Sequence, residues 1–480
     1  MTRMRWLLVV TCFISVHYTW AEGRQPNILV ILADDMGYGD LGVTGSVRLR
    51  TPHLDSLVKS GVFCRQGYVC SPVCSPSRAG LFTGRDPRRF GYQANLNQGA
   101  AAYDTRPELL GLPPGEHTLG DHLRSAGYAT ALIGKWHMGM GEAFHPLKRG
   151  FDYYCGMLTG SHTYFPKANQ HRIERNGQPV QEFSNPYLTD FFTDEALSWL
   201  DQHQDKKQPW FLFLSYNAPH GPMEATGDDL ALFEHIENPR RRTYAAMMYA
   251  LDRSVGRLRQ YLKVQGASQD TLIVFFSDNG GATNNASWNA DLSGAKGCLR
   301  EGGVRVPMVY SWPGVLPAGT GYEQPASSLD LLPTFMAAAQ ANPLPLREPM
   351  SHEDKSNFKK GVQHYGPYDG INLLPYLKGE QTAPPRKLFW RLQGQASVLQ
   401  GTEKLIRLSH RPAQLFRPAS DRGEAHDLSG LEPDTLQSLF EELSKWESML
   451  PTVPLWGSSP HWMGQSAKIY DTYVPGSEPK

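Results

Sequence analysis

The stretch NILVILADDMGYGDLG, from Asn27 to Gly42, decides the fold predicted for this chain of 480 residues. From Ile28 to Ala33 the run is wholly apolar, which is typical of a strand buried on both faces of a parallel sheet. Two carboxylates, Asp34 and Asp35, follow at once. Because ligands bind outside the carboxyl ends of strands in open α/β sheets, this junction predicts a functional site as well as a fold.

Three more apolar runs end in polar clusters in the same way. They are Tyr128 to Ile133 before Lys135-Trp136-His137, Trp210 to Tyr216 before His220, and Thr271 to Phe276 before Asp278-Asn279-Gly280-Gly281. Helices are expected at Thr51 to Gly61, Thr118 to Ser125 and Thr243 to Val264, and a further strand at Val304 to Trp312. This alternation predicts an α/β protein with a large mixed, mostly parallel sheet sandwiched by helices.

The chain divides into a large and a small unit. Residues 22–385 form the large one, with an insertion or long loop at 341–370 that is rich in Pro, Lys and His. Residues 386–480 form the small one. Its predicted elements are strands at Leu388 to Leu392, Ala396 to Leu399 and Lys404 to Leu408, and a helix at Thr435 to Met449. We expect a small antiparallel sheet and helix packed on the large unit, with a tail from Pro451 wrapping the surface.

The N-terminus has the pattern of a signal peptide. Arg3 and Arg5 precede a mostly apolar run from Trp6 to Tyr18, and a small-x-small cleavage pattern ends at Ala21. Cleavage of residues 1–21 predicts a secreted or periplasmic protein, or a lysosomal one if the source is an animal. The run is too short for stable insertion into a bilayer. With 47 basic and 47 acidic residues the net charge is zero, which argues against nucleic acid as a partner.

Cysteine use points to one unusual thiol. After cleavage five cysteines remain, an odd number, and this indicates a free or modified residue; they are Cys64, Cys70, Cys74, Cys155 and Cys298. Cys74 opens the pentapeptide Cys74-Ser75-Pro76-Ser77-Arg78. Modification of Cys74 would leave four, whose pairing the sequence does not decide.

The acidic clusters predict a metal site. Asp34, Asp35, Asp278 and Asn279 offer oxygen ligands only, a set that suits calcium best and magnesium second. Zinc calls for His or Cys ligands, which these strand ends lack. The alternative is a solvated turn at Asp34-Asp35 and an Asn-Gly turn at Asn279-Gly280.

Cations and histidines complete the candidate site. Arg78, Lys135 and Lys296 can bind the oxygens of an anionic ester, and His137 and His220 can carry protons. Each residue alone is more often a surface cation or a structural histidine. Lys296, however, lies between small residues in Gly294-Ala295-Lys296-Gly297, which let a ligand approach the backbone.

Six stretches together resemble the type I sulfatases of the alkaline phosphatase superfamily, over nearly the whole mature chain. They are Asn27 to Gly42, Cys74 to Gly84 (CSPSRAGLFTG), Gly134 to Gly139 (GKWHMG), Tyr216 to Pro222 (YNAPHGP), Ser277 to Gly281 (SDNGG) and Glu301 to Pro307 (EGGVRVP). The chain resembles secreted bacterial polysaccharide sulfatases and N-acetylgalactosamine-6-sulfatase-like arylsulfatases most. This implies an alkaline phosphatase-like fold and a sulfuric ester hydrolase acting on a sulfated carbohydrate.

The resemblance also implies a cofactor and a set of roles. Cys74 is converted to formylglycine by a separate maturation enzyme, and the hydrate of this aldehyde attacks the sulfate ester. One calcium ion is held by Asp34, Asp35, Asp278, Asn279 and the modified residue 74. Arg78 and His137 position and activate the hydrate. Lys135 and Lys296 bind the sulfate oxygens, and His220 protonates the leaving alcohol.

The chain departs from the family pattern at one place, and two other functions fit the same residues. Relatives often carry Arg-Gly-Gly-Lys where this chain has Ser293-Gly294-Ala295-Lys296, so a cation next to the substrate pocket is missing. His162 and Arg391 are candidates for contact with the sugar. The alternatives are a phosphodiesterase or phosphonate hydrolase with the same nucleophile, and a catalytically silent protein that binds sulfated glycans.

Overall fold

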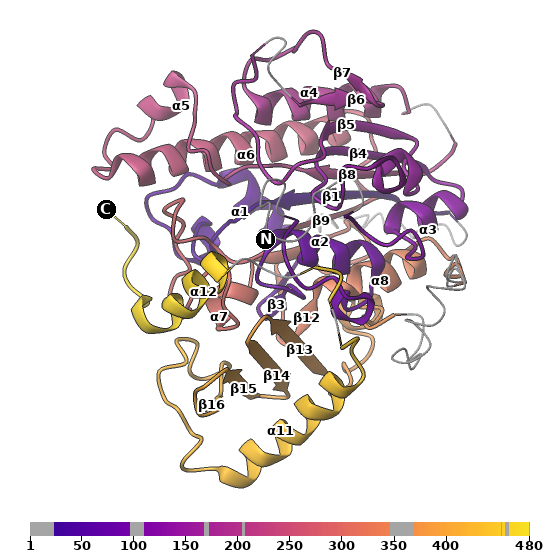
Figure 1. Cartoon of the computed structure of the whole chain (residues 1–480). Helices are drawn as coiled ribbons and strands as arrows, with labels where there is room; N and C mark the ends of the chain where they lie inside the picture. Colours follow the sequence, from indigo (N-terminus) through magenta and orange to yellow (C-terminus); the bar gives the residue numbers. More distant parts are fainter. Residues whose placement is uncertain are drawn as a thin grey trace, which may run out of the picture.

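The chain folds around one large sheet with a smaller sheet beside it (Figure 1). The computed structural model describes residues 24–96, 110–167, 172–203, 207–345, 368–452, 454–456 and 460–479. Within them, ten strands form a mixed sheet in the order β11-β2-β10-β9-β1-β8-β4-β5-β6-β7, and β13 to β16 form an antiparallel sheet. The predicted α/β class is confirmed. The predicted signal peptide, residues 1–21, and most of the predicted insertion at 341–370 lie outside the described residues.

The centre of the large sheet consists of the four strands that end in polar clusters. They are β1 (Asn27–Ala33), β4 (Ala129–Lys135), β8 (Trp210–Ser215) and β9 (Thr271–Ser277). β1 pairs in parallel with both β8 and β9, and β4 pairs in parallel with β8. Their carboxyl ends therefore lie side by side at one edge, which brings the four polar clusters together.

Helices cover both faces of this sheet. On one face they are α1 (Pro52–Lys59), α4 (Leu188–Asp201) and α6 (Pro239–Val264). On the other they are α2 (Cys74–Thr83), α3 (Leu119–Ser125) and α8 (Leu331–Ala338). Side chains of β1 alternate between the two cores: Leu29 and Ile31 join the first, Ile28 and Val30 the second. Among the described residues, no helix has the length and apolar character that a membrane span requires.

Shorter elements complete the large unit. The strands are β2 (Val62–Cys64), β3 (Gly67–Tyr68), β5 (Tyr153–Met157), β6 (Glu174–Arg175), β7 (Gln178–Pro179), β10 (Met308–Ser311), β11 (Thr320–Tyr322) and β12 (Ala326–Ser327). The short helices are α5 (Gly227–Ala231), α7 (Glu301–Val304) and α10 (Leu374–Leu377). The strand predicted from Val304 begins only at Met308, because Val304 ends α7 and Pro307 cannot donate to a sheet ladder.

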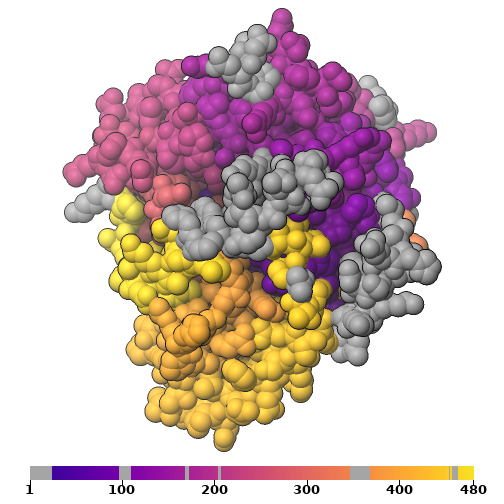
Figure 2. Space-filling view, in the orientation of Figure 1, coloured from indigo at the N-terminus to yellow at the C-terminus, as the bar shows by residue number. Residues whose placement is uncertain are grey.

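The small sheet and its helix lie at one end of the molecule (Figure 1), and the yellow C-terminal residues also extend along the side of the large unit (Figure 2). The elements of this C-terminal unit are β13 (Lys387–Leu392), β14 (Gln395–Gln400), β15 (Glu403–Leu408), β16 (Gln414–Phe416) and α11 (Pro433–Ser448). Ala396 and Val398 face α11, whereas Leu399 packs toward the large unit. The tail predicted to wrap the surface contains another helix, α12 (Pro460–Thr472).

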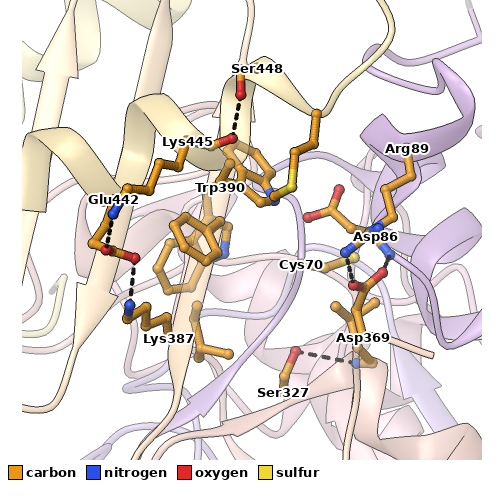
Figure 3. Close-up of a pocket in the computed structure, with 15 residues that line it drawn as sticks. Cys70, Asp86, Arg89, Ser327, Asp369, Lys387, Trp390, Glu442, Lys445 and Ser448 are labelled. Carbon is orange, nitrogen blue, oxygen red and sulfur yellow. Dashed lines mark hydrogen bonds and ion pairs between the residues drawn. The ribbon is translucent and has the colours of Figure 1, made fainter. Parts of the chain in front are cut away.

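A hollow of about 550 Å³ marks the seam between the two units (Figure 3). Its charged groups pair with one another. The Glu442 carboxylate forms ion pairs with Lys387 Nζ at 2.5 Å and with Lys445 Nζ at 3.0 Å. Arg89 Nη2 lies 2.6 Å from Asp369 Oδ1. These charges are already neutralised, so the hollow is best described as a polar seam that joins α11 and β13 to the large unit.

Gly134 allows β4 to lie close to β8, and its replacement tests this packing. Its φ is +106°, and a Cβ there would stand 1.9 Å from the Ser215 carbonyl oxygen. Gly134→Ala should lower the free energy of unfolding by about 3 kcal/mol or more, because strain and overlap add. Gly127→Ala is the matched control: φ is +93° and no described residue lies within 4 Å of the added Cβ, so about 1 kcal/mol is expected from strain. Equal urea midpoints for the two variants would contradict this account.

Candidate active site

The predicted metal residues come together at the carboxyl ends of β1 and β9. The Asp35 amide donates to Asp278 Oδ1 at 3.3 Å, and Asn279 Nδ2 donates to Asp35 Oδ1 at 2.7 Å. Asp34, Asp278 and Asn279 are fully buried, and Asp35 is nearly so. Asp35 also has a left-handed backbone, with φ of 65°. A non-glycine residue in this region is uncommon and is often found at functional sites.

Cys74 is the first residue of α2 and points at this acidic pair. Its Sγ lies 3.7 Å from Asp34 Oδ1, 3.9 Å from Asp35 Oδ1 and 3.1 Å from Lys296 Nζ. Pro76 sits in the first helical turn, where its missing N–H costs no hydrogen bond. The N-terminal end of α2 adds a partial positive charge that favours anions. Burial raises the pKa of the Cys74 thiol to about 12, so a thiolate is scarce at neutral pH.

Three buried cations neutralise the three aspartates. Lys135 Nζ lies 2.6 Å from Asp34 Oδ2, and Lys296 Nζ lies 2.6 Å from Asp35 Oδ1. Arg78 Nε and Nη2 both lie 2.9 Å from Asp278 Oδ2. The Arg78 and Lys135 side chains are wholly buried, and that of Lys296 is 15% exposed. Three negative and three positive charges therefore balance within one cluster.

The pKa values of the aspartates follow from this balance. Burial alone would raise the pKa of Asp34, but Lys135, His220 and Arg78 together hold it below its usual value. Burial would likewise raise the pKa of Asp35, but Lys296 holds this pKa below its usual value. Burial and the charge of Asp34 instead raise the pKa of Asp278 to about 6, despite Arg78. Asp34 and Asp35, which follow β1, thus remain ionised.

Two histidines flank the cluster. His220 Nε2 lies 3.6 Å from Asp35 Oδ2, while its Nδ1 lies 2.6 Å from the Gly221 carbonyl oxygen and donates to it. His137 Nε2 lies 3.3 Å from the Leu96 carbonyl oxygen, and its Nδ1 has no hydrogen-bond partner among the described residues. Burial lowers the pKa of both imidazoles. His137 also has a left-handed backbone, with φ of 59°.

The carboxylate and amide oxygens at this site fit a hard divalent cation, whereas the Cys74 thiol and the His220 imidazole beside them are softer donors. Asp34, Asp35, Cys74 and His220 each offer a ligand atom within 4.8 Å of the others. Asn279 Oδ1 is buried and accepts no hydrogen bond from the described residues, as expected for an oxygen directed at a cation. The prediction that these strand ends lack Cys and His ligands is wrong. Cys and His do lie beside the carboxylates, because α2 and the segment after β8 bring Cys74 and His220 to the strand ends.

A pocket of about 840 Å³ opens over the cluster. Of the two candidates for sugar contact, His162 lines it. Arg391 is not among the residues that line it; its Nε lies 3.7 Å from Glu447 Oε1 of α11. Side chains alternate along β13, so Arg391 points to the same side as Phe389, toward α11.

Several residues at the site had no distinct sequence pattern. Ser215, at the end of β8, accepts a hydrogen bond from Arg78 Nη1 at 2.7 Å. Gln465, Ser466 and Ile469 of α12 line the pocket, together with Leu392 and Gln393 from the β13–β14 turn. Pro460 as the first residue of a run without proline could have indicated α12. Its contact with the pocket follows only from the tertiary fold.

A buried centre of carboxylates, cations and a cysteine at the ends of parallel strands is typical of an α/β enzyme acting on an anionic ester. The sulfatase family profile matches residues 26–341. N-acetylgalactosamine-6-sulfatase from Sus scrofa is 35% identical over 401 residues, covering 79% of this chain and 72% of that protein. Arylsulfatase A from Homo sapiens is 30% identical over 518 residues, covering 96% and 95%. The chain belongs to the sulfatase family and is a sulfuric ester hydrolase.

Solved structures agree with this assignment. The crystal structure of Ps i-CgsB in complex with k-i-k-neocarrahexaose has a TM-score of 0.80 and 36% identity, covering 94% of this chain and 98% of that chain. The phosphonate monoester hydrolase of Agrobacterium radiobacter has a TM-score of 0.60 and 18% identity, covering 88% and 96%. The second likeness concerns the fold alone.

Asp34→Asn tests the metal site with almost no change in shape. Loss of one ligand charge should weaken calcium binding by at least about tenfold in isothermal titration. Asp252→Asn is the control: Asp252 is also buried, but it accepts hydrogen bonds from the amides of His53 and Leu54. Equal calcium affinity in the two variants would contradict the site.

Proposed function

We propose that the protein removes sulfate from a sulfated carbohydrate, with Cys74 converted to formylglycine and one calcium ion bound at Asp34, Asp35, Asp278 and Asn279. The observation that carries the proposal is the position of residue 74. Its Sγ lies 3.1 Å from Lys296 Nζ and 3.7 Å from Asp34 Oδ1, between a cation and the candidate metal ligands. The family likeness supports the same chemistry.

Two groups complete the site. A formylglycine hydrate at residue 74 would supply the attacking hydroxyl, and a calcium ion held by Asp34, Asp35, Asp278 and Asn279 would supply positive charge at the reaction centre. The protein's own charges fit these additions. Its three buried aspartates and three buried cations already cancel, so a divalent cation leaves the site positive. A positive and largely buried site favours an anionic ester and the charge that develops as its bond breaks.

Lys135 and Lys296 are the residues proposed to hold the sulfate group. Both are held in place by ion pairs of 2.6 Å to carboxylates, so they need little reorganisation when charge develops. Arg78 is fixed at three points: Asp278, the Lys135 carbonyl oxygen and Ser215 Oγ. It therefore orients the first turn of α2, and with it residue 74.

The two histidines are proposed as proton carriers. His220 lines the pocket, and its Nδ1–H is fixed on the Gly221 carbonyl oxygen, so Nε2 is the atom left to deliver a proton to the leaving alcohol. His137 also lines the pocket, and its ring packs against Gly160, where a Cβ would stand 2.6 Å away. This packing fixes the ring near residue 74, where it can accept the proton of the hydrate.

The pocket supports a carbohydrate substrate. A volume of about 840 Å³ exceeds the needs of a sulfate group and admits sugar rings. Its lining includes neutral hydrogen-bonding side chains that suit sugar hydroxyls: Asn95, Thr159, Ser161, Thr283, Asn284, Gln393, Gln465 and Ser466. Similar proteins include an N-acetylgalactosamine-6-sulfatase and a protein crystallised with neocarrahexaose. We further propose export after cleavage near Ala21 and activation by a formylglycine-generating enzyme.

Mass spectrometry of residue 74 combined with an aryl sulfate assay tests the proposal. In protein from its natural source, the tryptic peptide of residues 66–78 should carry an aldehyde at residue 74 and an unchanged thiol at Cys70, which serves as the internal control. Cys74→Ala should abolish sulfate release, because removal of the nucleophile costs several orders of magnitude. Normal turnover by Cys74→Ala would overturn the proposed nucleophile.

The role of His220 depends on the leaving group. His220→Gln should slow hydrolysis of a sugar sulfate by about a hundredfold, because the alkoxide leaves poorly without a proton. Hydrolysis of 4-nitrophenyl sulfate should fall much less, since its phenolate leaves unaided. Equal losses on the two substrates would contradict an acid role and indicate binding or metal ligation instead.

A further inference from the structure

Residues 293–301, here called the Lys296 loop, carry the cation that touches Asp35 and Cys74. The large unit holds the side of the loop nearest the nucleophile. The Lys296 amide donates to the Gly281 carbonyl oxygen at 3.0 Å, and the Gly297 amide donates to the Pro72 carbonyl oxygen at 2.9 Å. Lys296 has a long, flexible side chain, so the position of its ammonium group depends on how firmly this loop is held.

The two ends of the Lys296 loop meet on Glu424, a residue of the C-terminal unit. Its Oε2 accepts from Ser293 Oγ at 2.6 Å and from the Glu301 amide at 2.9 Å. Lys404 of β15 joins this contact, with Nζ 2.7 Å from Glu301 Oε1 and 3.0 Å from Glu424 Oε1. All three charged groups are almost fully buried. Burial alone would raise the pKa of Glu301, but Lys404 and Arg305 hold it below its usual value.

The middle of the loop is held by a second chain of hydrogen bonds. Gln395 of β14 donates from Nε2 to the Gly297 carbonyl oxygen at 2.9 Å. The Tyr470 hydroxyl of α12 donates to Gln395 Oε1 at 2.6 Å and accepts from the Leu299 amide at 2.8 Å. Gly297 and Leu299 flank Cys298, so this chain holds the loop one and three residues after Lys296.

Strand alternation explains why these groups face the loop. Ala396 and Val398 of β14 and Leu405 of β15 form the core with α11, so Gln395 and Lys404 point to the opposite face. That face packs on the large unit through Leu399. Buried polar groups on such a face are costly unless they are paired, and here each is paired to the Lys296 loop or to its neighbours.

We propose that the C-terminal unit and α12 position Lys296 for the reaction, through Glu424 at the ends of the loop and Gln395 and Tyr470 at its middle. The expected effect on kcat/KM rests on the proposed function. The contacts that hold the Lys296 loop do not depend on it. Residues remote in sequence thus act on the sulfate-binding cation without touching the substrate. Gln395, Glu424 and Tyr470 are positioning residues.

Tyr470→Phe is the most direct variant, because it removes one hydroxyl and keeps the ring. It should lower kcat/KM for an aryl sulfate by about tenfold, the order of effect expected when a binding group is displaced by a fraction of an ångström. In a Lys296→Ala background the same substitution should cost less than about twofold, because the residue that it positions is gone. Equal losses in both backgrounds would mean a general structural role and would overturn the proposal.

Asp471→Asn is the matched control. Asp471 is the next residue of α12 and also joins the helix to the C-terminal unit, through Arg411 at 2.6 Å, but this pair is exposed and touches no residue of the loop. Its kcat/KM should equal that of the wild type. A loss equal to that of Tyr470→Phe would show that any loosening of α12 suffices, and would overturn the specific role of the hydroxyl.

Amide hydrogen exchange gives a readout that does not depend on turnover. Peptides covering residues 293–301 should exchange faster in Tyr470→Phe than in the wild type or in Asp471→Asn, while peptides of β1 and β9 stay unchanged. If the wild-type protein releases no sulfate from any substrate, the proposed function fails, and the exchange data still decide the positioning claim. Unchanged exchange of the loop in Tyr470→Phe would overturn it.

Discussion

The buried ion pair between Lys135 and Asp34 shows the constraint on which the site depends. A carboxylate this deep in a protein is costly unless an opposite charge and hydrogen bonds compensate it. Three such aspartates lie within one cluster, and each has its own cation. The sheet must therefore deliver acids and cations to the same edge. The parallel pairing of the four central strands brings the aspartates and Lys135 there, while α2 and the segment 293–301 bring Arg78 and Lys296.

This constraint explains what the sequence could predict. A run of apolar residues followed by Asp34-Asp35, or by Asp278-Asn279, marks a strand and its functional end together, since both depend on local order in the chain. The fold class and the strand-end residues of the cluster were accessible for that reason, whereas Cys74, Arg78 and Lys296 lie on α2 and on a loop and were predicted from the motifs shared with the sulfatases. Arg391 shows the limit: its place in β13 was predictable, but whether its side chain faces the pocket or α11 depends on how the small sheet docks.

The two faces of the small sheet in the C-terminal unit differ in character. One face of this sheet forms a core with α11, yet its other face carries buried polar groups such as Lys404. Groups of this kind cost stability unless they are fully paired. Their pairing with the segment that carries Lys296 gives a reason for their burial, and it makes the small unit part of the site. No periodicity in the sequence could reveal this, because the contacts with the Lys296 loop join residues 98 to 171 positions apart.

The central claim is that turnover depends on the converted form of residue 74. The most direct measurement is the rate of sulfate release from a sulfated oligosaccharide, read by ion chromatography, in preparations whose conversion at residue 74 has been quantified by mass spectrometry. The account predicts a rate proportional to the converted fraction and none from the thiol form. Equal rates from converted and unconverted protein would contradict it.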